Sequence, residues 1–161
     1  MVHARVAQSL RLPEELAAFL QGGRIVIFAT RDASLRPHLA RALAPRLEPG
    51  HRRMALCVPI RESGQCLQDL QFHPRIAITF SEPTTYRTYQ LKGRVVGRRD
   101  LGAPEHEALA RYTEGLTEAC LAVGMPEGLV QRLWSDRFTR LDVALEQAFA
   151  QTPGAGAGDP L

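Results

Sequence analysis

The sequence predicts an α+β protein whose sheet is mainly antiparallel and closes into a small barrel. Five strand-like runs succeed one another between residues 24 and 98, and one short helical pattern separates the third run from the fourth. Two further helical patterns and a last strand follow. Because this order lacks the repeating strand–helix alternation of a parallel sheet, it favours antiparallel pairing with helices at the periphery.

The first element is a helix expected over residues 12–21. Pro13 suits the first helical position, and Glu14 and Glu15 complement the positive end of the helix dipole. Gly22 follows the last turn, where a helix commonly stops.

Three strands are expected next, at residues 24–30, 38–47 and 53–60. The first is a β-branched and aromatic run that is too short for a helix. Pro45 lies within the second strand and has no N–H to donate, so it predicts a bulge or a sheet edge there.

A helix is expected over residues 64–72 because His73 and Pro74 follow it, and a fourth strand should cover residues 75–80. The fifth strand, residues 86–98, alternates between two faces. One face carries Tyr86, Thr88, Gln90 and Lys92, and the other carries Arg87, Tyr89 and Leu91. Gly93 interrupts this strand and predicts a bulge or a close backbone approach.

The C-terminal third of the sequence changes to a helical period. A helix is expected from Pro104 to Gly124, and a shorter one begins at Pro126. Alternation in the first half of residues 138–151 predicts a last strand, whereas residues 146–151 suit either a strand or a helix.

The composition indicates one domain over residues 1–151 and a Gly/Pro/Ala-rich tail, residues 152–161, which we expect to be flexible unless it docks. No apolar run is long enough to span a bilayer or to serve as a signal peptide, so we expect a cytoplasmic protein without a membrane partner. Among 20 Lys and Arg residues only Lys92 is a lysine, and there is no Asn, a bias that indicates a GC-rich, bacterial coding background.

The polar residues argue against two function classes. The net charge is +3, but basic and acidic residues are interspersed and no aromatic-plus-basic recognition motif appears, so no nucleic-acid partner is expected. The five histidines form no HxxxH or HExxH pair and the three cysteines no CxxC, so no metal site is expected.

Residues 58–80, VPIRESGQCLQDLQFHPRIAITF, raise the main functional question. Arg61 and Ser63 follow the strand expected at residues 53–60, and a helix is expected immediately after them. Ser63 is suited to cap that helix, and the exposed N–H groups of a first turn also bind phosphate. The local sequence is compatible with a capped helix, a phosphate site, or both.

The order of elements, together with the segments ATRDASLRPHLARAL, FHPRIAITF and YRTYQLKGRVV, resembles the FMN-binding split β-barrel proteins related to pyridoxamine 5'-phosphate oxidase. The resemblance covers residues 10–100 well and the remainder loosely. It implies a split barrel with peripheral helices, and a homodimer with two FMN sites at the subunit interface.

The resemblance also implies where FMN would lie. Arg41, Ala42 and Leu43 would flank the flavin ring, and Cys57, Val58 and Pro59 would run beneath it. The residues expected near the phosphate are Arg61, Ser63, Gln65 and Cys66. Arg87 and Thr88 occupy the positions of an Arg-Gln pair in the family, and Gln90 lies on the same strand face as Thr88.

This sequence departs from the family at the phosphate end. Many members begin the helix with Ser-Arg-Lys, where this chain has Gly64, Gln65 and Cys66. Two cations are thereby lost, although Arg61 and Ser63 stand just upstream as substitutes. Glu62 between them would oppose an anion.

The resulting hypothesis is an FMN-binding flavoprotein, a flavin-dependent oxidoreductase with an unidentified substrate. Its catalytic residues are unknown, because no side chain stands out as an obligatory acid or base; His38 is a candidate proton donor. The C-terminal residues do not match the substrate-phosphate site of pyridoxamine 5'-phosphate oxidase, so a true pyridoxamine 5'-phosphate oxidase is not expected. The alternatives are a split barrel that has lost tight FMN binding and acts as a binding or regulatory module, and a haem-binding variant with His38, His51 or His73 as axial ligand.

Overall fold

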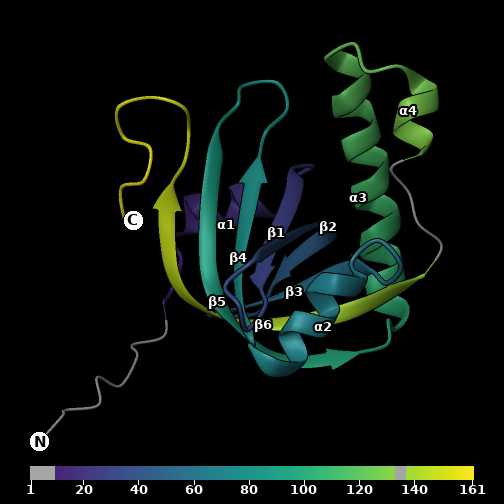
Figure 1. Cartoon of the computed structure of the whole chain (residues 1–161). Helices are drawn as coiled ribbons and strands as arrows, with labels where there is room; N and C mark the ends of the chain where they lie inside the picture. The colour runs from purple at the N-terminus through teal and green to yellow at the C-terminus, as the bar shows by residue number, and fades with distance from the viewer. Residues whose placement is uncertain (1–9, 133–136) are drawn as a thin grey trace, which may run out of the picture.

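Six antiparallel strands form one closed barrel with helices on its outside, in the part of the chain that the computed structural model describes, residues 10–132 and 137–161 (Figure 1). Around the barrel the strands follow the order β1-β2-β3-β6-β5-β4. The predicted α+β class and antiparallel barrel are confirmed.

The helices and strands follow the predicted order along the chain. They are α1 (Glu14–Leu20), β1 (Ile25–Arg31), β2 (Pro37–Leu47), β3 (Arg53–Pro59), α2 (Gly64–Phe72), β4 (Arg75–Ser81), β5 (Thr88–Arg99), α3 (Ala103–Ala122), α4 (Glu127–Gln131) and β6 (Phe138–Ala150).

The barrel closes through β6, which pairs with β3 on one side and β5 on the other. Val143 lies opposite both Met54 of β3 and Val95 of β5. The strand continues to Ala150, so the open choice for residues 146–151 is resolved in favour of a strand. Pairing with β5 satisfies the backbone groups of this segment, which a helix would satisfy internally.

Two irregularities in the strands occur where the sequence predicts them. The β2–β3 register shifts between Leu43 and Arg46, at Pro45, and Ala44 takes a left-handed φ of 46°. The β5–β6 register shifts between Lys92 and Gly93. Pro45 therefore marks a bulge and not a sheet edge, since both neighbours of β2 are present in the closed barrel.

The fifth strand starts two residues later than predicted. Tyr86 has a left-handed φ of 60° and lies in the turn, where its N–H donates to the carbonyl of Glu82. β5 begins at Thr88, and from there the predicted alternation holds, with Leu91 buried and Lys92 exposed.

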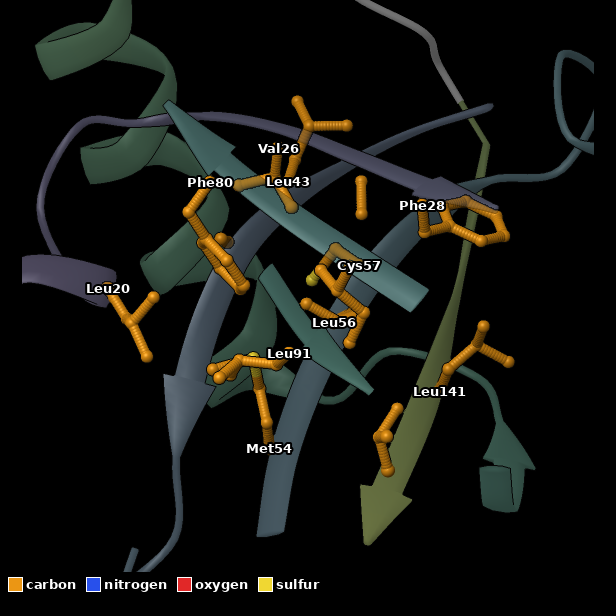
Figure 2. Packing of buried hydrophobic residues seen from close by; sticks show 14 of the residues in the cluster. Leu20, Val26, Phe28, Leu43, Met54, Leu56, Cys57, Phe80, Leu91 and Leu141 are labelled. Atoms are coloured by element: carbon orange, nitrogen blue, oxygen red, sulfur yellow. The ribbon is translucent and has the colours of Figure 1, made fainter. Parts of the chain in front are cut away.

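The inward faces of the strands fill the barrel with apolar side chains. Phe28, Leu56, Ile78 and Leu91 are fully buried, and each comes from a different strand. Figure 2 shows the labelled members of this cluster gathered between the strands. Burial of these side chains supplies most of the driving force for folding.

A buried ion-pair cluster fixes the beginning of α3 against the barrel. Glu105 of α3 accepts hydrogen bonds from Arg140 of β6 and, at 2.8 Å, from Arg46 of β2. Asp142 pairs with Arg140 on the same strand. Burial raises the pKa of Glu105, but the Gly102 N–H and Arg140 outweigh it, so the carboxyl stays ionised.

The Gly/Pro/Ala-rich tail turns back along β6. The N–H of Gly158 donates to the carbonyl of Ala150 over 2.7 Å, and the N–H of Leu161 donates to the carbonyl of Ala148 over 3.0 Å. Figure 1 shows the C-terminus beside the end of β6. The flexibility expected of residues 152–161 stays a prediction.

Gly93→Ala should destabilise the barrel by about 1–3 kcal/mol, because the added Cβ would lie 2.2 Å from the carbonyl oxygen of Ala144. Gly115→Ala is the matched control: it adds a Cβ inside α3 with no atom within 4 Å, and should stabilise by about 1 kcal/mol. Urea unfolding of the two variants should therefore shift in opposite directions, and an equal shift would contradict the close approach at Gly93.

Candidate functional site

α2 packs against β1 and β2 through a buried carboxylate. Asp69 is only 3% exposed, and its Oδ2 accepts a hydrogen bond of 2.7 Å from the Thr30 hydroxyl of β1. The same oxygen lies 2.8 Å from Nδ1 of His38 in β2. Gln65, one turn earlier in α2, donates its amide to Oδ1 over 3.2 Å.

Three hydrogen bonds keep Asp69 ionised. Burial raises the pKa of Asp69, but hydrogen bonds from Thr30, His38 and Gln65 outweigh burial and hold the pKa below the usual 3.8. Because a carboxylate only accepts hydrogen bonds, Nδ1 of His38 carries a proton toward it. In neutral His38 the basic nitrogen is therefore Nε2, and the ring is half-buried.

The junction between β3 and α2 carries the residues expected near a phosphate. Ser63 occupies the N-cap position but makes no capping hydrogen bond through its side chain. Its hydroxyl oxygen is buried and has no hydrogen-bond partner among the described residues. Arg61 is exposed beside it, and an added Cβ at Gly64 would meet no atom within 4 Å.

The junction is thus not the conventional capped helix that one interpretation of the sequence predicts. The first N–H groups of α2 have no acceptor within the helix, and the Ser63 side chain does not supply one. Gln65 is hydrogen-bonded to Asp69, and Cys66 is buried with a pKa raised by burial. The groups left for an anion are therefore Arg61, the Ser63 hydroxyl and the open backbone at Gly64.

The residues expected around a flavin ring divide into buried and outward-facing sets. The side chains of Ala42, Leu43, Val58 and Pro59 are buried. Among them Ala42 and Leu43 border a small apolar cavity of about 110 Å³ beneath α3. Their side chains belong to the packing of the protein, and their role toward FMN stays a prediction.

Arg41 and Gln90 face outward in one cross-strand row. Arg41 lies opposite Ile27 in β1, Ile27 opposite Thr79 in β4, and Thr79 opposite Gln90 in β5. The amide of Gln90 donates to the Thr79 hydroxyl over 3.2 Å. The barrel therefore places two predicted ring contacts, Arg41 and Gln90, on the same outer surface.

Thr88 lies at the beginning of β5 in a local network of hydrogen bonds. Its hydroxyl oxygen is 2.9 Å from that of Ser81, and it donates to the carbonyl of Tyr86. Its N–H donates to the Thr152 hydroxyl at the start of the tail. These partners account for the polar groups of Thr88 without a ligand.

Sequence reasoning missed the role of Asp69 and Thr30. Asp69 lies on α2 four residues after Gln65, a spacing that places both on one helix face, but their partners are more than thirty residues away in sequence. Only the packing of α2 against β1 and β2 brings these groups together.

Comparisons with known proteins address the fold. No protein-family model matches the sequence, and no curated protein sequence matches it. Among solved structures, HupZ from Group A Streptococcus is 18% identical with a TM-score of 0.54, and the match covers 91% of this chain and 99% of HupZ. An F420 reductase is 16% identical with a TM-score of 0.59, over 85% of this chain and 98% of the reductase.

A third solved structure is a pyridoxamine 5'-phosphate oxidase-related, FMN-binding protein from Nostoc punctiforme. It is 17% identical with a TM-score of 0.50, over 88% of this chain and 84% of that protein. The chain has the FMN-binding split β-barrel fold. The resemblance stated from the sequence is thereby confirmed at the level of the fold.

Two further findings concern membrane-spanning helices and metal-binding groups. Within residues 10–132 and 137–161, no helix is long and apolar enough to cross a membrane. In the same ranges, no group of three or more His, Cys, Asp and Glu side chains is arranged to hold a metal ion.

Asp69→Asn should lower the free energy of unfolding by about 1–3 kcal/mol at neutral pH, because three donors lose an ionised acceptor. The folded pKa of Asp69 is depressed, so its contribution is complete above the unfolded value of 3.8 and is lost as the pH falls through the folded pKa. The deficit of the variant should therefore shrink between about pH 5 and pH 2.

Urea unfolding across that pH range measures the effect. Asp100→Asn, which removes an exposed carboxylate, is the control and should change stability little at any pH. A deficit for Asp69→Asn that stays constant down to the lowest pH would contradict an ionised, buried Asp69.

Proposed function

We propose that this protein binds FMN non-covalently and acts as a flavin-dependent oxidoreductase. Solved structures of the same fold include a protein described as FMN-binding and an F420 reductase, and these descriptions support a flavin-type cofactor. The observation that carries the proposal is the unpartnered Ser63 hydroxyl at the N-terminus of α2, beside exposed Arg61.

The β3–α2 junction suits the phosphate of FMN chemically. A dianionic phosphate would receive hydrogen bonds from Ser63 and from the first N–H groups of α2, and a charge-assisted bond from Arg61. The positive end of the α2 dipole adds to the attraction. Open space around Gly64 leaves the backbone approachable.

The outward row from Arg41 to Gln90 would face the flavin ring. Bound FMN would supply the electron-transfer chemistry, and the protein would orient it through hydrogen bonds. Since the Gln90 amide nitrogen already donates to Thr79, its carbonyl oxygen is the group available to a ring N–H. Arg41 offers donors at the other end of the row. His38, held by Asp69 on the face of β2 opposite to Arg41, is the candidate on this strand for moving a proton through Nε2.

A second candidate function is a binding or regulatory module without tight FMN affinity. It is favoured by the engagement of Gln65 with Asp69 and the burial of Cys66, which leave one cation where many family members have two. Exposed Glu62 adds a negative charge at the same place.

The haem-binding alternative depends on His38, His51 or His73. Nδ1 of His38 is hydrogen-bonded to a carboxylate, as is usual for histidines that bind iron through Nε2. An absorption spectrum separates the three possibilities directly.

The proposed homodimer would use the outer surface of β1 and β2. Ile27 and Leu39 lie on this surface with exposed fractions of 40% and 66%. A second copy that covers these side chains would remove a contiguous apolar area from water, and place the outward row of Arg41 at an interface.

Purified protein mixed with excess FMN and desalted should keep a flavin absorption spectrum. The double variant Arg61→Ala, Ser63→Ala should bind FMN more weakly by about 2 kcal/mol, roughly 30-fold, because it loses a charge-assisted bond and a neutral one. Arg111→Ala removes an exposed cation from α3 and is the matched control.

Equal affinity of wild type and the double variant would show that the phosphate is not held at this junction. Wild-type protein that releases all FMN on desalting would support the binding-module candidate. A Soret band in the purified protein would support the haem-binding alternative.

Leu39→Arg should weaken the dimer at least about tenfold, because it places a charge in an apolar interface. Leu129→Arg, which alters another exposed leucine, 51% exposed on α4, should leave association unchanged. Sedimentation equilibrium across a range of protein concentrations measures both. A wild-type monomer, or equal loss in both variants, would contradict an interface on β1 and β2.

A further inference from the structure

A cavity of about 400 Å³ lies on the outer surface of the barrel, over β1, β4 and β5. It exists because small residues occupy neighbouring outward positions. Ala29 of β1 lies opposite Ala77 of β4, and Ala77 lies opposite Lys92 of β5. Gly93 follows Lys92 and has no side chain. The backbone of β6 lies so close to Gly93 that a side chain would not fit there. The cavity floor is therefore fixed by backbone geometry.

Longer side chains surround this shallow floor. Leu35 and Pro37, from the turn and strand after β1, form an apolar wall. Leu35 has a left-handed φ of 65° and is 67% exposed, so the backbone holds an apolar side chain in water at the rim. Gln147 of β6, directly opposite Lys92, supplies an amide on the other side.

The charges that line the cavity have one sign. Arg31, Arg75 and Lys92 line it, and its lining includes no carboxylate. Arg75 is paired with Glu146 over 3.1 Å, which leaves two cations uncompensated. Neither Arg31 nor Lys92 makes an ion pair with another described residue, and Nζ of Lys92 lies 4.8 Å from the centre of the Phe149 ring.

We propose that this cavity binds an organic anion, a carboxylate or a phosphate ester, with a flat apolar body. A volume near 400 Å³ suits a small aromatic ligand. The alanine floor and the Leu35–Pro37 wall would cover its apolar faces, while Arg31 and Lys92 would hold the anionic group.

The inference goes beyond FMN binding, because it concerns residues other than those expected to hold FMN. The cavity lies one outward row from Gln90, since Gln90 and Lys92 are two residues apart on β5. An anion here would stand next to the row proposed to face the flavin ring. The single lysine of the chain thus has a specific role, which its position in the sequence alone left open.

The test uses full-length protein and three naphthalene probes in isothermal titration calorimetry. The probes are 1-naphthyl phosphate, 1-naphthoate and uncharged 1-naphthalenemethanol. Lys92→Gln and Arg31→Gln should each weaken anion binding at least about fivefold, and Arg111→Gln, with the same charge change on α3, should not. Ala77→Leu should block binding by filling the floor, and a circular dichroism melt verifies that each variant is folded.

The site would be established if both anions bind and if Lys92→Gln and Arg31→Gln weaken that binding. The anion that binds more tightly would show whether the site prefers a carboxylate or a phosphate. Equal binding of the uncharged probe, no binding at all, or anion binding unaffected by these substitutions would overturn it. FMN titrations keep the two proposals distinct. Loss of FMN binding only in the Arg61→Ala, Ser63→Ala variant would support separate sites. Loss of FMN binding only in Lys92→Gln would assign FMN itself to this cavity, and would show that the β3–α2 junction does not hold its phosphate.

Discussion

Pairing of β6 with both β3 and β5 is the constraint on which the rest of the structure depends. In a closed barrel every strand has a neighbour on both sides and none is an edge strand. The side chains of each strand therefore point alternately into the barrel and out of it. Close contact between Gly93 and Ala144 shows how tightly the closing strands approach. The outward rows that carry Arg41, Gln90 and Lys92 are a direct consequence of this alternation.

A second constraint links the barrel to its candidate cofactor site. Asp69 attaches α2 to β1 and β2, and a buried carboxylate is tolerated only because its oxygens receive hydrogen bonds. Since Ser63 stands at the other end of the same short helix, the position of the β3–α2 junction depends on Asp69. Stability and the proposed phosphate recognition therefore depend on the same helix, α2.

Two distinct surfaces follow from this arrangement. The β3–α2 junction concentrates hydrogen-bond donors with one exposed arginine, whereas the cavity over β1, β4 and β5 combines an apolar floor with cations. The first chemistry suits a phosphate on a helix N-terminus, and the second suits an aromatic anion. The proposed flavin-dependent oxidoreductase would need a place for its substrate beside the cofactor, and the proposed anion cavity lies next to the row proposed to face the flavin ring.

The sequence by itself determined the order of elements and the α2 boundaries, and it marked Pro45 and Gly93 as positions where a strand is irregular. The hydrophobic period and the backbone restrictions of proline and glycine are local properties of the chain. The sequence misplaced the start of β5, since nothing local marks the left-handed φ of Tyr86. Tertiary structure alone decided that β6 runs to Ala150, that Asp69 meets Thr30 and His38, and that two alanines hollow a cavity beside Lys92. These features depend on contacts between residues distant in sequence, and only the closure of the barrel brings them together.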